Sequence, residues 1–348
     1  MVTENGKSTI QEIAKWAAIG AGTFLIANTI YKALNHYDLK GKVVLVTGGS
    51  RGLGLVLARQ LAAKGARLAI CARTPEQLGQ AHIELETLGA EVMSMTVDVT
   101  DQRQVQAMII DILEHYGRLD VLINNAGIVQ VGPQENMGVN EYEQAMKANF
   151  WSALYTMLAV IPYFKEQGGG RIVNVTSIGG KIAVPHLLPY TASKFALVGL
   201  SEGMNAELKK DNILVTTVVP NLMRTGSPRN ITVKGDHEAE YAWFKLADSS
   251  TFLSQSAETA AAEIIKAIEQ GESEAILSAT AKVAAILQGF APGWMNLLMG
   301  IANKLLLPDT VAGRGVSKKG YESEPIPAIA ATGGKSDPEA VKNNEVSE

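Results

Sequence analysis

The stretch Val43-Val44-Leu45-Val46-Thr47-Gly48-Gly49-Ser50-Arg51-Gly52-Leu53-Gly54 decides how this chain folds. It begins with an apolar run typical of a strand buried on both faces, and a helical pattern follows its glycines. Glycines at a strand-to-helix turn let the backbone approach a phosphate, and the helix N-terminus supplies N–H donors and a partial positive charge. We therefore expect a phosphate site here, although glycines needed only for tight packing would give the same pattern. The residues expected at the site are Thr47, Gly48, Ser50, Arg51, Gly52, Leu53 and Gly54.

Short β-branched runs alternate with longer helical patterns from about residue 39 to residue 278. The strand-like runs are 43–47, 67–71, 92–97, 121–124, 171–175, 213–219 and 274–277, and the helical stretches include 53–64, 75–88, 102–116, 141–164 and 193–209. Strands without polar alternation indicate a mostly parallel sheet covered by helices on both faces. The sequence predicts an α/β fold, a single doubly wound Rossmann-type domain with a mostly parallel seven-stranded sheet.

Composition excludes several classes of protein. The chain has 348 residues, of which 47% are apolar and 19% charged, so it has ample material for a core. A net charge of −4 without a basic block argues against nucleic-acid binding. The single cysteine, Cys71, excludes an intrachain disulfide and fits a reducing compartment. No histidine or cysteine spacing indicates a metal site.

Two uncharged stretches flank this domain. Residues 16–31 lie between Lys15 and Lys32 and fall slightly short of the ~20 residues that span a bilayer. We expect an apolar N-terminal helix that anchors the chain to a membrane, and a helix packed on the domain is the alternative. Residues 283–303 are interrupted by Pro292-Gly293, which favours two short apolar helices that cover a cavity or dip into the membrane interface over a spanning helix.

These features divide the chain into four parts. The predicted boundaries are 1–37 for the hydrophobic helix, 38–280 for the Rossmann-type domain, 281–307 for the helical extension and 308–348 for the tail. The tail is rich in Gly, Pro, Ser, Lys and Glu, a composition typical of a solvated, disordered segment.

Tyr190 and Lys194 stand four residues apart, which places both side chains on one face of a helix. A tyrosine hydroxyl normally has a pKa near ~10, and a nearby positive charge lowers it. We therefore interpret the pair as a general acid/base, although two neighbours on a solvated helix produce the same spacing.

The residues after the second strand indicate which cofactor binds. A free ribose 2′-hydroxyl usually meets an acidic side chain at this point, whereas a 2′-phosphate meets arginine. The chain has Ala72-Arg73-Thr74 there, and Arg51 lies in the glycine turn. Two guanidinium groups can clasp a phosphate through charge-assisted hydrogen bonds, so we expect NADP(H) rather than NAD(H). An exposed strand-end charge is the alternative reading of Arg73.

Further motifs complete a resemblance to a known family. The glycine turn and the Tyr190–Lys194 pair occur together with Asp98-Val99, Asn124-Asn125-Ala126-Gly127, Asn149 and Ser177. Over roughly residues 39–278 this set resembles the short-chain dehydrogenase/reductase superfamily in order and spacing. The resemblance implies that Asp98 binds the adenine amino group beside the Val99 amide. It also implies that Asn124, Asn125, Ala126 and Gly127 stabilise the central strand and wall the adenosine ribose.

The same resemblance implies four catalytic roles. Asn149 holds a water that links Lys194 to solvent, and Ser177 hydrogen-bonds the substrate carbonyl or hydroxyl. Tyr190 donates or removes the proton, while Lys194 binds the nicotinamide ribose and lowers the pKa of the tyrosine. These roles are chemically coherent, because hydride transfer to a carbonyl leaves an alkoxide that needs a hydrogen-bond donor and a proton.

The chain departs from the family at one turn. The family usually has Pro-Gly after the sixth strand, whereas this chain has Pro220-Asn221. Asparagine tolerates a positive φ better than most residues, so the turn is expected to survive. Pro220 and Thr225 remain candidate cofactor contacts, with Thr225 near the nicotinamide amide or the pyrophosphate.

Apolar residues surround the expected site and indicate a lipophilic carbonyl or alcohol as substrate. They are Ile178, Ile182, Ala183, Val184, Leu187, Leu188 and Pro189, with Leu222, Met223, Tyr241, Trp243 and Phe244 as a predicted lid.

We expect association with a membrane, the catalytic domain on its cytoplasmic side, and a homodimer or homotetramer; a cytoplasmic enzyme is the alternative location. A non-catalytic NADP(H)-binding redox sensor is the competing function, but a sensor has no need of a tuned proton donor.

Overall fold

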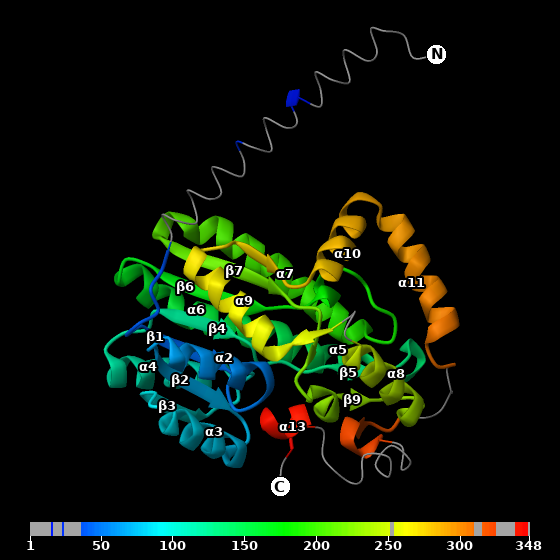
Figure 1. Ribbon diagram of the computed structural model, residues 1–348, viewed down its shortest axis with the longest axis horizontal. Helices are drawn as coiled ribbons and strands as arrows, with labels where there is room; N and C mark the ends of the chain where they lie inside the picture. Colours follow the sequence, from blue (N-terminus) through cyan, green and yellow to red (C-terminus); the bar gives the residue numbers. More distant parts are fainter. Residues whose placement is uncertain are drawn as a thin grey trace.

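The computed structural model describes residues 15, 16, 23, 36–250, 254–309, 315–324 and 338–346. Seven parallel strands form the central sheet in the order β11-β7-β6-β4-β1-β2-β3, and helices cover both of its faces (Figure 1). The strands are β1 (Val43–Thr47), β2 (Arg67–Ala72), β3 (Val92–Thr96), β4 (Val121–Asn124), β6 (Gly170–Val175), β7 (Ile213–Val219) and β11 (Glu274–Ile276). The predicted doubly wound α/β fold is confirmed.

Strand β1 shows why the sheet forms a double-sided core. All of its residues are buried, and alternate side chains point to opposite faces. Val44 and Val46 pack into one hydrophobic core, and Val43 and Leu45 pack into another. The first core includes α2 (Gly52–Ala63), α3 (Pro75–Thr87) and α9 (Ala257–Gln270), and the second includes α4 (Gln102–Tyr116), α6 (Ser152–Glu166) and α7 (Leu188–Leu208).

The predicted helix over 141–164 is divided in the structure. Helix α5 (Val139–Met146) passes into a π-helical turn, Lys147–Trp151, before α6 begins. The wider turn rotates the helix face, and it places Asn149 in a buried position. Turns of this kind are frequent at functional sites, but apolar periodicity does not reveal them.

Two helices follow the last strand of the sheet, as the Pro292-Gly293 interruption predicts. Helices α10 (Ala279–Phe290) and α11 (Pro292–Leu306) form a hairpin that projects from the domain (Figure 1). No helix in the described part of the chain is long and apolar enough to span a bilayer. Apart from Trp16 and Thr23, the predicted N-terminal anchor at 16–31 lies outside the described residues.

Smaller elements complete the mouth of the domain. They are β5 (Gln130–Val131), β8 (Leu222–Arg224), β9 (Thr232–Val233), α8 (His237–Ser249), β10 (Ser254–Ser256), β12 (Lys318–Lys319) and α13 (Pro338–Lys342). Two of these belong to the tail that the sequence predicts to be solvated. Strand β12 pairs with β9, and α13 lies beside α2 and α3 (Figure 1). Segments 315–324 and 338–346 therefore differ from that prediction, because their polar groups find hydrogen-bond partners on the domain.

A pair of glycine substitutions tests the packing of the glycine turn. A Cβ added at Gly54 would lie 2.6 Å from Asn125 Nδ2 and would overlap with Gly48 O, so we expect Gly54→Ala to destabilise the fold by about 1–3 kcal/mol. Gly79 lies in the next helix, and a Cβ there meets no atom within 4 Å. Gly79→Ala should therefore stabilise by about 0.5–1 kcal/mol. Urea denaturation measures both, and equal effects would contradict the close approach at Gly54.

Candidate functional site

A cavity of about 340 Å³ lies at the carboxyl ends of the central strands. Its lining includes the residues that directly follow the strands: Gly48 after β1, Arg73 after β2, Asn125 after β4 and Pro220 after β7. In open parallel α/β sheets, ligands bind outside this edge where the strand order reverses. The cavity is therefore the candidate functional site.

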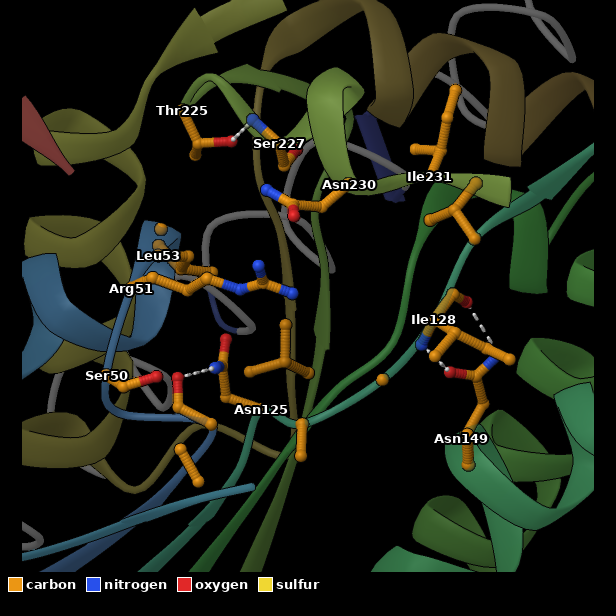
Figure 2. A pocket seen from close by; sticks show the side chains of 18 of the residues that line it. Ser50, Arg51, Leu53, Asn125, Ile128, Asn149, Thr225, Ser227, Asn230 and Ile231 are labelled. Atoms are coloured by element: carbon orange, nitrogen blue, oxygen red, sulfur yellow. Dashed lines mark hydrogen bonds between the residues drawn. The ribbon is translucent and has the colours of Figure 1, made fainter. Parts of the chain in front are cut away.

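Nearly all of the predicted site residues converge on this cavity, and Figure 2 shows several of them. The two exceptions are Thr47 and Gly54, which do not line the cavity but contact residues that do. The Thr47 hydroxyl accepts hydrogen bonds from the backbone N–H of Asn125 (3.0 Å) and Ala126 (3.1 Å). Gly54 packs against the Gly48 carbonyl. Both residues hold the glycine turn and the end of β4 together rather than facing a ligand.

The glycine turn has the geometry that a phosphate site requires. Gly48 and Gly52 both have positive φ, at 66° and 54°, which favours glycine. A Cβ at Gly48 would lie 3.1 Å from the Ala126 Cα. Gly52 begins α2, so its amide stands at the positive end of the helix, and Arg51 extends from the turn into the pocket (Figure 2). The chain's own groups thus fit the pyrophosphate of a dinucleotide.

Charged side chains gather at the same end of the cavity. Arg51 and Arg73 line it as predicted, and two residues of the C-terminal segments, Lys319 and Glu345, line it as well. Burial, with repulsion from Arg51 and Arg73, lowers the pKa of Lys319. Sequence reasoning missed Lys319 and Glu345, because no local pattern signals that a polar tail returns to the site.

The predicted catalytic residues meet at the other end of the cavity. Tyr190 and Lys194 lie on α7, and Lys194 Nζ is 5.7 Å from the centre of the Tyr190 ring. Lys194 also donates a hydrogen bond to Val175 O at 2.9 Å. Ser177 follows β6, and its hydroxyl accepts the Gly179 N–H at 3.0 Å. The three side chains line one surface, as the resemblance implies.

Asn149 is held by three side-chain hydrogen bonds. Its Oδ1 accepts the Ile128 N–H at 2.9 Å, and its Nδ2 donates to Ile128 O at 3.1 Å (Figure 2). Its Nδ2 also donates to Ser193 Oγ at 2.9 Å. A Cβ at Gly127 would lie 2.6 Å from Asn149 Oδ1 and 3.7 Å from Lys194 Nζ. Asn149 therefore connects the end of β4 to α7, and its place in a water relay stays a prediction.

The electrostatics of the tyrosine differ from the sequence-based expectation. Lys194 is 5% exposed, and burial lowers the pKa of its ammonium group to about 8. Tyr190 keeps part of its surface open to the cavity, but surrounding protein atoms desolvate it. Burial therefore raises the pKa of Tyr190, with a smaller opposing effect from a hydrogen bond with Ser177. The expected lowering by Lys194 does not appear, because desolvation of the phenolate dominates.

The turn after β7 lies at the site as predicted, but a side-chain hydrogen bond holds it rather than a positive φ at Asn221. Asn221 does not adopt a positive φ, and its amide donates a hydrogen bond to Thr280 Oγ1 at 3.0 Å. Thr225 lines the cavity, and its hydroxyl accepts the Ser227 N–H at 3.1 Å (Figure 2). The substitution of asparagine for glycine is thus accommodated by a side-chain hydrogen bond.

The predicted lid forms a small core of its own beside the cavity. Buried members include Leu187, Tyr241 and Phe244, and Trp243 packs against them. Phe244 and Met223 reach the cavity lining, whereas Tyr241 is 1% exposed and belongs to this core. A buried pair, His186 Nδ1 and Glu240 Oε1 at 2.8 Å, joins the loop before α7 to α8.

Comparison with known proteins gives a family match over most of the domain. A family model described as short chain dehydrogenase matches residues 42–234. The "Dehydrogenase/reductase SDR family protein 7-like" of Anopheles gambiae is 32% identical over 265 residues, which cover 74% of this chain and 82% of the relative. A "Fatty acyl-CoA reductase" of Acinetobacter baylyi is 30% identical over 296 residues, 84% of this chain and 94% of that protein.

A solved structure is similar as well. The short chain dehydrogenase from Mycobacterium paratuberculosis bound to NAD has a TM-score of 0.52 and 28% sequence identity to this chain. The match covers 54% of this chain and 74% of the mycobacterial protein.

Proposed function

The chain belongs to the short-chain dehydrogenase family, and we propose that it transfers a hydride between NADP(H) and the carbonyl or hydroxyl group of a lipophilic substrate. Membership makes it an oxidoreductase of C=O and CH–OH groups with a nicotinamide cofactor. One observation carries the rest of the proposal. Ser177, Tyr190 and Lys194 line the same cavity as the glycine turn, so a dinucleotide on that turn can extend toward them.

The proposed catalytic roles follow from the geometry and charge of these residues. The bound nicotinamide supplies the hydride for reduction. Ser177 offers a hydrogen-bond donor to the carbonyl oxygen, and Tyr190 donates the proton that the developing alkoxide needs. The raised pKa keeps Tyr190 protonated at neutral pH, which suits donation. The Lys194 ammonium, 5.7 Å from the centre of the ring, would stabilise the phenolate that remains, and it would also hold the ribose of a bound nicotinamide cofactor.

The choice of NADP(H) is supported by two arginines. Arg51 and Arg73 line the end of the cavity where the second strand stops, and Arg73 stands where NAD-binding chains usually place an acid. The similar mycobacterial protein is bound to NAD, so cofactor preference varies within this fold. A guanidinium pair at this position favours the additional phosphate of NADP(H).

A lipophilic substrate is supported by the cavity wall. Apolar side chains that line the cavity include Ile128, Val129, Met223, Ile231 and Phe244, and of these only Met223 and Phe244 are among the apolar residues that the sequence predicts around the site. One relative is named fatty acyl-CoA reductase, and a fatty acyl group is an apolar chain. We propose an acyl-chain, sterol or similarly apolar ketone or alcohol.

Membrane association is supported by the α10–α11 hairpin. Phe290 is 89% exposed and Trp294 is 67% exposed, although both are large and apolar. Lys282 and Lys304 are the only charged residues over 279–306, which suits an anionic lipid surface. We propose that the hairpin lies in the interface of a membrane, with the domain on the cytoplasmic side.

We also propose self-association through exposed Trp151, Leu158 and Phe195, which light scattering would reveal as a multiple of the chain mass.

Removal of one hydroxyl tests the catalytic proposal. Tyr190→Phe should lower the rate of NADPH-dependent ketone reduction by about 10²–10⁴-fold, because the alkoxide loses its proton donor. Affinity for NADPH should stay within about threefold, since the phenol is outside the phosphate end. The assay uses a panel of lipophilic ketones, with Tyr163→Phe, an exposed tyrosine outside the cavity, as the matched control.

The pH profile gives a second readout of the same site. The pKa of Lys194 lies at about 8, so its charge is present below that pH and lost above it. Reduction by the parent protein should therefore decline as pH rises through about 8. A parent that binds NADPH but reduces no ketone would instead favour the redox-sensor function.

Charge reversal tests the cofactor proposal. Arg73→Asp should weaken NADPH binding on the order of 10–100-fold while leaving NADH within a few-fold, because it replaces a charge-assisted hydrogen bond with repulsion. Arg103→Asp makes the same change at a 92% exposed side chain outside the cavity and should alter neither affinity. Equal losses for the two cofactors in Arg73→Asp would contradict the 2′-phosphate role.

Two substitutions in the hairpin test the membrane proposal. Phe290→Asp with Trp294→Asp should reduce binding to phosphatidylcholine–phosphatidylserine vesicles about tenfold or more, because two exposed aromatic side chains that would enter the membrane interface become charged. Ile83→Asp with Leu88→Asp changes two exposed apolar residues near α3 and should have little effect. Unchanged vesicle sedimentation of the hairpin variant would remove the hairpin from the proposal.

A further inference from the structure

The C-terminal segment 338–346, named here the C-terminal strap, lies across the phosphate end of the cavity. It contains α13 and the residues up to Val346, and it stands beside α2 and α3 (Figure 1). Its Glu345 lines the cavity together with Arg51 and Gly52. Asn343 and Ala340 are both fully buried, so the strap is packed against the domain rather than resting loosely on it.

Hydrogen bonds attach the strap to the side of the cleft that carries the glycine turn. Asn344 Nδ2 donates to Ser50 O at 2.8 Å and to Gln77 O at 3.0 Å. Arg59 donates to Lys342 O at 2.7 Å and to Asn343 Oδ1 at 3.2 Å. The strap thereby joins α2, the turn before it and α3.

The strap is also attached to the opposite side, formed by the loop after β8. Ala340 packs so closely on Gly226 that no Cβ fits there. Asn343 Nδ2 donates to Thr225 O at 3.3 Å, and Asn230 Nδ2 donates to a Glu345 carboxylate oxygen at 2.6 Å. The cleft that a dinucleotide enters is therefore bridged from both walls.

The strap places two oxygen acceptors on the groups that a pyrophosphate needs. The Gly52 N–H, at the start of α2, donates to Asn343 O at 2.8 Å. The Glu345 carboxylate lies 3.6 Å from Arg51 Nε, and a Cβ at Gly52 would lie 2.5 Å from its Oε1. The Asn343 carbonyl therefore contacts the N-terminus of α2, and the Glu345 carboxylate contacts Arg51. Both the helix N-terminus and the arginine attract anions.

We propose that the C-terminal strap is an autoinhibitory segment that occupies the anion subsite of the dinucleotide cavity and must leave before NADP(H) binds. This inference rests on the proposed function, since it concerns the same cavity and cofactor.

Mutual exclusion follows from the contacts. The single Gly52 hydrogen cannot serve Asn343 O and a phosphate oxygen with good geometry at the same time. A phosphate near Arg51 would also face the Glu345 carboxylate at close range, and this carboxylate is only 6% exposed. Burial raises the pKa of Glu345 to about 7, despite the opposing effects of Arg51 and Asn230, so the exclusion rests on the space that the side chain fills and on the Gly52 N–H that the strap already uses.

The size of the effect depends on how often the strap is open. Apparent affinity falls in proportion to the fraction of molecules that are competent to bind. A strap that is closed in about 90–99% of molecules would weaken NADP(H) about 10–100-fold. Displacing the strap should recover this factor.

Two adjacent residues of α13 provide the test in the full chain. Ala340 is fully buried against Gly226, so Ala340→Asp should detach the strap and tighten NADPH binding about tenfold or more. Val341 is 56% exposed, so Val341→Asp adds the same charge to the same helix and should bind as the parent does. Titration calorimetry with NADPH measures each dissociation constant.

A second variant and a second readout guard against a misfolded protein. Glu345→Ala removes the carboxylate from the cavity without burying a new charge, and it should also tighten NADPH binding. In the parent, amide hydrogen exchange over 338–346 should become faster when NADPH is added, because the cofactor displaces the strap.

The outcomes are distinguishable. If Ala340→Asp and Glu345→Ala bind NADPH no more tightly than the parent, or bind it more weakly, the strap is no inhibitor and this inference is overturned. Slower exchange over 338–346 with NADPH would likewise overturn it in favour of a clasp that holds the cofactor. If none of the chains binds NADPH or NADH, the proposed function fails together with the inference.

Discussion

The site depends on the close approach of two backbone segments, the glycine turn after β1 and residues 125–127 after β4. Thr47 accepts the backbone N–H of Asn125 and Ala126, and Gly48 and Gly54 leave no room for a Cβ between the segments. Gly127 continues the contact, because a Cβ there would overlap with Asn149 Oδ1 and would lie in van der Waals contact with Lys194 Nζ. A series of missing Cβ atoms therefore links the phosphate end of the cavity to the catalytic end, and any larger residue would separate them.

Burial gives the cavity its electrostatic character at both ends. It lowers the pKa of Lys194 to about 8 and raises that of Glu345 to about 7, which brings both groups close to neutral pH. It also raises the pKa of Tyr190, which keeps the phenol protonated and able to donate. A charge in such a place needs a partner, and the Glu345 carboxylate has one in Arg51, whose Nε lies 3.6 Å away.

Much of the fold and of the site follows from local patterns. Uninterrupted apolar runs predict the seven strands of the sheet, and the structure has all of them, with one end shifted by a residue at 67–71, 92–97, 171–175 and 274–277. The edge strand β3 is only partly buried. The glycine turn, Ser177, Tyr190 and Lys194 are recognisable because chemistry requires particular residue types at particular spacings. The π-turn around Asn149 is not, since a change from one helical turn to a wider one leaves no mark in the periodicity.

Local sequence thus specifies the strands, the helices, the glycine turn and the residue types of the candidate site, because each depends on residues within a few positions of one another. The packing of distant segments decides the rest. The raised pKa of Tyr190 arises from atoms contributed by several elements, and the lid becomes a core through contacts between the loop before α7 and α8. The polar segment 338–346 has the composition of a solvated tail and docks only because the cleft offers it donors and acceptors. Composition indicates that the segment is well solvated in water, but it does not indicate whether a complementary surface of the domain can provide hydrogen-bond partners for it.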